Sequence, residues 1–396
     1  MTPWLTLIGI GEDGALSPAA RERLSQAALI VGGTRHLALV GETAGERMAW
    51  PSPLQAAFAD ILARRGERVC VLASGDPFFF GVGSLLSELI PAEEIESFPQ
   101  PSAFSLAASR LGWALQDCVA LTLHGRPLAG VLPHLQPRAR ILALSWDGET
   151  PARLAALLRA RGLGESRLTV FEAMGGPRER RCAALARDFG ESPIDPLNTI
   201  ALEVADMVGE RVAPRAAGLP DDWFEHDGQI TKRETRALTL SALAPRSRET
   251  LWDVGAGSGS VGVEWLLADP SLKAYAIERD PARCARIRRN AEGLGVPHLQ
   301  IVEGAAPQAL TGLPAPDAVF IGGGLGQAVE PCWAALRPGG RLVVNAVTLE
   351  SQAALCDLSR RYGGALIQAQ FARAEPVGRF RGFRPAMPVV QWRAVK

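Results

Sequence analysis

Two glycine-rich turns lie far apart in this chain of 396 residues, and each has residues suited to binding a nucleotide-like cofactor. The more complete turn reads D-V-G-A-G-S-G-S from Asp253 and follows the stretch T-L-W. Glycine at 255, 257 and 259 permits a sharp turn between strand and helix, and it lets a ligand approach the backbone closely. The first N–H groups of the following helix have no partner within the helix, so they can bind that ligand. The turn therefore predicts a cofactor site at a helix N-terminus.

An acid farther along the chain strengthens this prediction. Glu278 ends the stretch A-Y-A-I-E, at the spacing where an acid typically holds the hydroxyls of a ribose. A nicotinamide dinucleotide site is one alternative, but its fingerprint GxGxxG requires glycine at 260, where this chain has Ser260. A tight turn that binds nothing is the other alternative, and Glu278 argues against it.

The pattern D-x-G-x-G-x-G resembles the first motif of the Rossmann-type S-adenosylmethionine-dependent methyltransferases. The resemblance implies that Asp253 meets the cationic methionine end of the cofactor, directly or through water, and that G-A-A from Gly304 contacts adenine. It also favours S-adenosylmethionine over a dinucleotide. The implied cofactor-binding residues are Asp253, Gly255, Gly257, Ser258, Gly259, Glu278, Gly304 and Ala305.

The segment G-Q-I-T-K-R-E precedes the first strand of this region. One interpretation places Thr231 and Lys232 across the mouth of the cofactor site, with Thr231 on the cofactor and with Lys232 and Arg233 on the substrate. The alternative is a capping box, in which Thr231 and Glu234 cap the start of a helix.

The segment I-G-G-G ends a later strand, at the edge of a doubly wound sheet where acceptors bind. Gly322, Gly323 and Gly324 would let a flat acceptor slide close to the methyl group of the cofactor. A plain flexible turn is the alternative.

The first glycine turn, G-I-G-E-D-G from Gly9, is a weak signal by itself because no ribose-binding acid follows at the expected spacing. A later strand, however, ends in Gly75-Asp76-Pro77, followed by three phenylalanines that cannot all face inward from one regular element. The turn L-T-L-H-G-R-P contains His124 and Arg126. A lone histidine is more often structural, whereas Arg126 could hold a carboxylate with two hydrogen bonds.

Together these segments resemble the tetrapyrrole (corrin/porphyrin) methylase family. The resemblance implies that Gly9, Gly11, Gly75, Asp76, Pro77 and Ser102 bind S-adenosylmethionine. It also implies two α/β lobes with the cofactor in the cleft between them. Ala103 stands where the family usually has a second serine.

Alternating strand-like and helix-like stretches predict α/β folds for both regions. In the first, S-P-A-A-R-E-R-L-S-Q-A predicts a helix with Ser17 as N-cap and Pro18 at the first helical position. In the second, five strand-like stretches with helices between them predict a doubly wound parallel sheet, and two further strands could follow near the end of the chain. The predicted organisation is a tetrapyrrole methylase domain over 1–208, a linker over 209–222 and a Rossmann-type domain over 223–396.

Composition excludes several classes of protein. Lys and Arg total 42, as do Asp and Glu, so neutral charge argues against a nucleic-acid partner. No apolar stretch approaches the length needed to span a membrane, and the N-terminus does not resemble a signal peptide. The six cysteines form no C-x-x-C pair, which predicts reduced, mostly buried thiols and no metal site. We therefore expect a cytoplasmic protein, and a homo-oligomer.

The combination of segments resembles one bifunctional family over nearly the whole chain, the precorrin-6B (precorrin-6Y) C5,15-methyltransferases (decarboxylating) of cobalamin biosynthesis. The resemblance implies two molecules of S-adenosylmethionine per chain, methylation of a precorrin at C5 by the first region, and C15 methylation with loss of the C12 acetate carboxyl group in the second. No general base is identified. The carboxylates of the substrate are expected to meet His124, Arg126, Lys232, Arg233, Arg379, Arg381 and Arg384, with a solvated charged loop as the alternative for the last three.

Two other functions remain open from the residues alone. An RNA methyltransferase would need a basic face with aromatic side chains. A regulatory protein that only senses S-adenosylmethionine would keep a cofactor site but transfer no methyl group.

Overall fold

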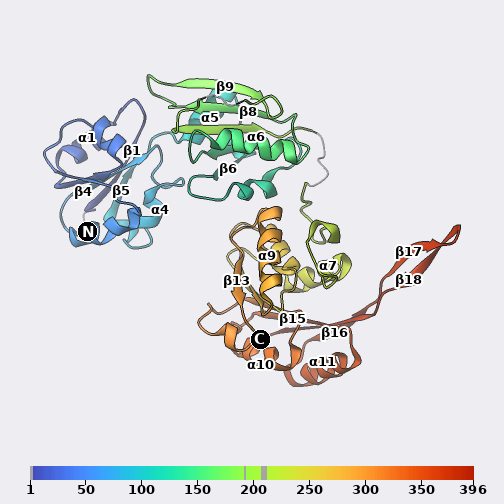
Figure 1. Ribbon diagram of the computed structural model, residues 1–396. Helices are drawn as coiled ribbons and strands as arrows, with labels where there is room; N and C mark the ends of the chain where they lie inside the picture. The colour runs from blue at the N-terminus through green and yellow to red at the C-terminus, as the bar shows by residue number, and fades with distance from the viewer. Residues whose placement is uncertain (1–2, 191–192, 207–211) are drawn as a thin grey trace. The chain divides into compact units, whose positions relative to one another are not determined.

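The computed structural model describes residues 3–190, 193–206 and 212–396 (Figure 1). The chain divides into two compact units, Met1–Leu128 with His134–Arg211 and Ala129–Pro133 with Val212–Lys396. Each unit has its own sheets and its own hydrophobic clusters, so each is described by itself.

The first unit begins with a five-stranded parallel sheet in the order β3-β2-β4-β1-β5. Helices α1 and α2 cover one face and α3 and α4 the other, because apolar residues of the strands alternate between two separate clusters. The bounds are β1 Leu5–Ile10, α1 Pro18–Ser25, β2 Leu29–Gly32, α2 Thr34–Leu39, β3 Glu46–Ala49, α3 Phe58–Ala63, β4 Val69–Ser74, α4 Val82–Leu86 and β5 Ile95–Phe98, with 3₁₀ turns at Leu54–Ala57 and Ala92–Glu94.

A second five-stranded sheet, in the order β6-β7-β10-β8-β9, completes this unit. Only β6 and β7 pair in parallel, and the other neighbours are antiparallel. Helix α5 packs Phe104 against the middle strands. The bounds are α5 Ala103–Leu111, β6 Cys118–Thr122, β7 Arg140–Leu144, α6 Thr150–Ala160, β8 Arg167–Glu172, β9 Arg180–Leu185 and β10 Asn198–Glu203, with 3₁₀ turns at Leu115–Asp117 and Leu128–His134. The two sheets give the two α/β lobes that the sequence predicts.

The second unit is built on a seven-stranded sheet in the order β13-β12-β11-β14-β15-β19-β16. The first five strands are parallel, and β19 pairs antiparallel with both β15 and β16. Helices α7, α8 and α9 pack on one face, and α10 and α11 pack on the other. The doubly wound sheet predicted from the sequence is therefore confirmed.

The elements of the second unit follow in chain order. They are α7 Arg233–Leu243, β11 Thr250–Val254, α8 Ser260–Ala268, β12 Lys273–Glu278, α9 Pro281–Leu294, β13 Gln300–Glu303, β14 Ala318–Ile321, α10 Leu325–Ala335, β15 Arg341–Ala346, α11 Leu349–Tyr362, β16 Ala365–Ala369, β17 Ala372–Val377, β18 Phe380–Pro385 and β19 Val389–Val395, with 3₁₀ turns at Asp221–Trp223 and Gln308–Leu310.

A two-stranded ribbon, β17 with β18, extends from the seven-stranded sheet without joining it (Figure 1). The sequence predicts two late strands, but the stretch A-L-I-Q-A-Q-F-A-R-A-E contains two short strands, β16 and β17, and the sequence analysis missed β18.

The segment predicted as a linker is partly structured. Residues 209–211 lie outside the described residues, whereas 212–222 belong to the second unit. The N–H groups of Gly218 and Leu219 donate to the carboxylate of Glu264 in α8, at 2.6 and 2.8 Å.

The six cysteines form no disulfide: three are buried, two are half-buried and Cys356 is exposed. Within the described ranges, no helix has the length and apolar character needed to cross a bilayer.

Candidate cofactor sites

In the first unit, three segments meet where parallel strands end. Gly75 donates its N–H to the carbonyl of Ile10 at the end of β1, and the carbonyl of Gly75 accepts from Gln100 N–H, both at 3.1 Å. A Cβ atom at Gly9 would lie 1.9 Å from the Gly75 carbonyl oxygen, and one at Gly75 would lie 2.9 Å from Ser102 Cα. These glycines therefore permit backbone–backbone approach between the predicted cofactor segments.

Two of the predicted side chains in these segments already have local partners. Ser102 is buried and caps α5, because its hydroxyl accepts from Ser105 N–H at 3.2 Å. Asp76 accepts from Phe78 N–H at 2.8 Å. Gly11 differs from Gly9, since a Cβ atom there would meet only the side chain of Asp13. Gly11 is thus opposed by a flexible side chain, at 2.8 Å, and not by backbone.

A polar cluster that the sequence analysis did not predict lies beside both turns. Glu12, next to Gly11, pairs with Arg35 and with Arg178, and Arg35 donates to the hydroxyl of Ser74, which precedes Gly75, at 3.0 Å. His36 Nε2 lies 2.9 Å from the same hydroxyl. Burial, with a smaller contribution from the charge of Arg35, lowers the pKa of His36 to about 4, so this imidazole is neutral at pH 7.

In the second unit, the three glycines of the turn after β11 have three different roles. A Cβ atom at Gly255 would lie 2.8 Å from Gly323 N, and one at Gly259 would lie 2.7 Å from Ile287 in α9. At Gly257 the nearest atom would be the carbonyl oxygen of Gln229, 3.9 Å away. All three glycines have positive φ. Gly257 is therefore the position that leaves space for a ligand, while Gly255 and Gly259 serve packing.

The two acids of this site are buried. Asp253 accepts from Gly262 N–H at 2.9 Å, and Glu278 accepts from Gly257 N–H at 2.9 Å. Burial, with a smaller contribution from the charge of Glu278, raises the pKa of Asp253 to about 7. The other carboxylate oxygen of Asp253 has no hydrogen-bond partner within the described ranges. A buried, incompletely paired acid beside a second acid suits the cationic end of S-adenosylmethionine, so these residues fit the cofactor.

The remaining predicted contacts lie nearby. Gly304, after β13, donates to the carbonyl of Glu278 at 2.9 Å, and Ala305 is exposed beside it. The carbonyl of Ser258 accepts from Asn290 in α9 at 2.9 Å, while its hydroxyl is buried and has no hydrogen-bond partner in the part of the chain that is described.

The segment before α7 is held over the glycine turn. Asn290 also bonds the backbone of Glu225 in both directions, at 2.8 and 3.0 Å, and Arg283 donates to Asp227 and Gln229 at 2.9 and 3.0 Å. The interpretation that puts Thr231 and Lys232 near the mouth of the site is consistent with this path of the chain.

The alternative capping box does not form. Helix α7 starts at Arg233, its N-cap is Lys232, and no side chain caps it. Glu234 pairs instead with Arg373. The carbonyl of Thr231 accepts a hydrogen bond from Arg236, which holds this residue just before the N-cap.

Arg236 is the second group that the sequence analysis missed. It is fully buried, pairs with Glu264 at 2.5 Å and with Asp221 at 3.2 Å, and also donates to the carbonyl of Leu219. Its guanidinium lies over the ring of Phe224. This one side chain therefore ties residues 219–231 to α7 and α8.

The predicted substrate-binding residues are dispersed. Gly322 donates to the carbonyl of Val254 at 2.9 Å, so I-G-G-G lies against the glycine turn, and Gly324 has positive φ at the N-cap of α10. Lys232 and Arg233 are exposed at the start of α7. In the first unit, His124 and Arg126 are exposed after β6.

The arginines near the end of the chain stand on the β17–β18 ribbon rather than beside the glycine turn. Arg381 donates to the carbonyl of Ala374, Arg384 pairs with Glu375, and Arg379 lies over Phe380. Their role in substrate binding stays a prediction.

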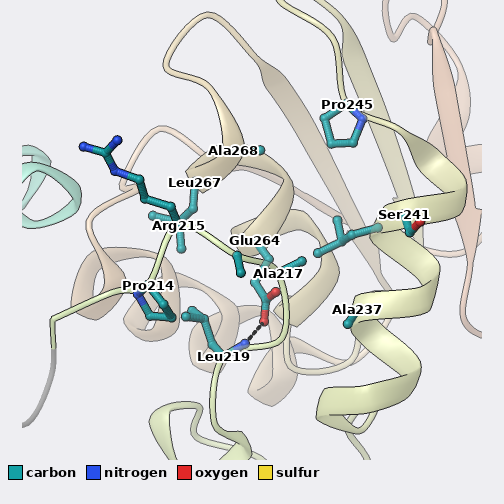
Figure 2. A pocket seen from close by; sticks show the side chains of 12 residues that line it. Pro214, Arg215, Ala217, Leu219, Ala237, Ser241, Pro245, Glu264, Leu267 and Ala268 are labelled. Carbon is teal, nitrogen blue, oxygen red and sulfur yellow. Dashed lines mark hydrogen bonds between the residues drawn. The ribbon is translucent and has the colours of Figure 1, made fainter.

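A hollow of about 250 Å³ lies elsewhere in the second unit (Figure 2). It is lined by Pro214, Leu219 and Leu240, and by Leu267 and Ala268 at the C-terminal end of α8. The glycine turn lies at the opposite, N-terminal end of α8, so this hollow is separate from the cofactor site.

Comparisons with known proteins identify a family for each of the two units. Residues 5–189 match the family described as Tetrapyrrole (Corrin/Porphyrin) Methylases, and residues 222–396 match the family described as Precorrin methyltransferase domain. The chain is similar to a precorrin-6Y C(5,15)-methyltransferase [decarboxylating] of Sinorhizobium sp, with 55% identity over 99% of this chain and 96% of that protein. A protein of the same name from Mycobacterium tuberculosis is 41% identical over 99% of this chain and its full length.

A shorter relative matches only part of the chain. The cobalt-precorrin-6B C(15)-methyltransferase (decarboxylating) of Salmonella typhimurium is 38% identical over 166 residues, which make up 40% of this chain and 85% of that protein. Two relatives that match almost from end to end, and two family matches that fall on the two α/β units, leave one assignment: the chain belongs to the precorrin-6Y C5,15-methyltransferase (decarboxylating) family of S-adenosylmethionine-dependent enzymes.

Proposed function

We propose that this enzyme methylates a precorrin at C5 in its first unit and at C15 in its second, and that the second unit also removes the carboxyl group of the C12 acetate. The observation that carries the proposal is the presence of two unlike glycine-rich turns in one chain, one per unit, each at the ends of parallel strands. The C15-methylating, decarboxylating relative is a protein of its own, which supports a single unit performing both of these steps. C15 lies next to ring C, so one docked orientation can serve C15 and the C12 acetate.

S-adenosylmethionine, when bound, supplies an activated methyl group at each site. In the second unit, Asp253 holds the cationic end, Glu278 holds the ribose, and Gly257 leaves room for the cofactor beside the backbone. Lys232 and Arg233 hold carboxylates of the substrate. The task of these residues is mainly to align donor and acceptor at near-attack distance, which can supply several kcal/mol of the barrier.

We further propose that each chain binds two molecules of S-adenosylmethionine and works in the cytoplasm on a small-molecule tetrapyrrole, without nucleic acid. The division into a tetrapyrrole methylase domain up to residue 208 and a Rossmann-type domain from residue 223 belongs to the same proposal. The alternatives of an RNA methyltransferase and of a protein that only senses the cofactor are not favoured by a chain whose relatives at this identity carry methyltransferase names.

The test uses one arginine substitution per site. Gly257→Arg should fill the second cofactor pocket and abolish C15 methylation and CO2 release while C5 methylation survives. Gly11→Arg should abolish C5 methylation while C15 methylation and CO2 release survive. The fold should tolerate this arginine, because only the flexible side chain of Asp13 opposes it. Mass spectrometry of precorrin products gives the readout, and calorimetric titration with S-adenosylhomocysteine should fall from two sites per chain to one in each variant.

Gly293→Arg is the matched control, since it adds the same side chain at an exposed position in α9 with open space around it. It should keep both methylations and both sites. A wild-type stoichiometry of one would contradict the proposal of two cofactor sites. Loss of CO2 release with Gly11→Arg instead of Gly257→Arg would reverse the assignment of decarboxylation to the second unit.

A further inference from the structure

The three consecutive phenylalanines after Gly75-Asp76-Pro77 are not buried in the core of the first unit. Phe78, Phe79 and Phe80 are 45%, 36% and 43% exposed. Exposed aromatic rings that adjoin one another are uncommon on a soluble protein and mark sites of contact with a ligand or partner. The three rings therefore mark a candidate site of ligand contact in the first unit.

The turn that carries the rings is held by three local hydrogen bonds. Asp76 accepts from Phe78 N–H at 2.8 Å, Phe79 donates its N–H to the carbonyl of Asp76 at 3.2 Å, and Gly83 donates to the carbonyl of Pro77 at 2.9 Å. A flexible loop would let the rings fold inward, whereas this bonded turn keeps them exposed.

Phe80 is also held in a strained conformation. Its φ is +55°, in the left-handed region that bulky residues rarely adopt. Such strain persists where the surrounding structure imposes it, and it is concentrated at functional sites. A glycine would occupy this position without strain, so the chain retains a phenylalanine ring where the backbone disfavours one.

Two of the rings form a continuous surface. The rings of Phe79 and Phe80 stack with centroids 5.3 Å apart and planes 24° apart. Both lie against Phe104, at 4.8 and 5.6 Å, and Phe104 is buried in α5 against the second sheet. Phe104 follows Ser102, whose Cα closely approaches Gly75, so the surface lies at the meeting point of two cofactor segments.

From these contacts we propose that the rings of Phe79 and Phe80, supported by Phe104, form the platform on which a conjugated part of the tetrapyrrole stacks for C5 methylation. A stacked ring system is attracted to an aromatic face largely independently of its substituents. The platform adjoins Gly75-Asp76-Pro77, so a stacked macrocycle would lie beside the methyl donor. The inference rests on the proposed C5 activity of the first unit.

The test variant is Phe79→Leu with Phe80→Gly. Leucine keeps the apolar packing on Phe104 but lacks a ring face, and glycine relieves the positive φ, so the fold should survive. Losing two stacking contacts should raise KM for the precorrin in C5 methylation by about tenfold, with kcat and S-adenosylhomocysteine affinity unchanged. C15 methylation by the same molecules is the internal control. Phe79→Tyr should behave as wild type, and Leu89→Ala, which removes a different exposed apolar side chain of this unit, should change nothing.

A second measurement separates the platform from the proposed activity. Uroporphyrin III, a stable planar tetrapyrrole, is titrated into the full chain and followed by its fluorescence; the double variant should lose about tenfold affinity at one site. If the double variant binds uroporphyrin more weakly than wild type does, but wild type makes no C5 product, the platform stands and the proposed function fails. Unchanged KM and unchanged uroporphyrin binding in the double variant, or a loss confined to S-adenosylhomocysteine affinity, would overturn the platform.

Discussion

At Asp253 we expect cofactor binding to be linked to the stability of the second unit. Its folded pKa, about 7, lies above the ordinary value because the carboxyl group is buried. A raised carboxyl pKa stabilises the folded state below the ordinary pKa, and this contribution is lost as pH rises through the folded pKa. We therefore expect the second unit without cofactor to become less stable between about pH 4 and pH 7.

Thermal melts across this range test the expectation, with Asp253→Asn as the comparison. The asparagine variant should lose this pH dependence and should bind S-adenosylmethionine at least tenfold more weakly, because it lacks the charge opposite the cationic end. An identical pH profile in both proteins would mean that another group titrates.

Gly255 and Gly257 predict different costs for the same substitution. Both have positive φ, so alanine at either position strains the backbone by about 1–2 kcal/mol. Only at Gly255 would the added Cβ atom press on the backbone of Gly323, which should cost about 1–3 kcal/mol more. Denaturant melts should show the larger loss for Gly255→Ala, and equal losses would contradict the close approach.

For single residues, contacts between near neighbours in the fold could be predicted from the sequence, whereas long-range contacts could not. The closeness of Gly257 and Glu278 follows from local spacing, because the turn and the next strand are neighbours in a parallel sheet. The pairing of Glu12 with Arg178 joins residues that are 166 positions apart in the chain, and no local sequence pattern predicts it. The close approach of Gly323 to Gly255 is likewise a contact that no local sequence signal predicts, and the role of Gly255 in cofactor binding stays a prediction.

Among the elements, α7 depends on one buried arginine. Arg236→Met keeps much of the side-chain volume but leaves Glu264 buried without its cation, which should lower the free energy of unfolding of the second unit by about 3–5 kcal/mol. Residues 219–231 should loosen as well, so cofactor affinity at this site should fall. Arg246→Met, at an exposed position after α7, is the control and should change stability little. A loss below about 1 kcal/mol for Arg236→Met would show that the pair is dispensable.

Element prediction succeeded where signals are local. Ser17 caps α1 and Pro18 begins it, as expected, because cap chemistry lies within four residues of sequence. Strand β18 was missed because its side chains are mostly exposed and show no apolar alternation. Its partner β17 could not be separated from β16 in the sequence, since the difference lies in pairing: β16 joins β19, and β17 joins only β18.

For the whole molecule, the two units predict that the chain can be divided. The cut belongs within 207–211, because Pro214, Gly218 and Leu219 already pack on or bond to the second unit. The pieces 1–206 and 212–396 should each be soluble and folded by circular dichroism, and the second should release CO2 from the precorrin. A second piece starting at Asp222 is the comparison; it lacks the backbone partners of Glu264 and should melt at a lower temperature. Two unfolded pieces would refute the division.

The position of β19 has a consequence for synthesis on the ribosome. This strand is the last element in chain order, yet it lies inside the sheet between β15 and β16. Residues 389–395 must therefore leave the ribosome before the second unit can close its sheet, whereas every strand of the first unit has emerged long before. Nascent chains should thus carry a finished first unit and an incomplete second one, with the edges of β15 and β16 unpaired and in need of protection from aggregation until residues 389–395 have emerged.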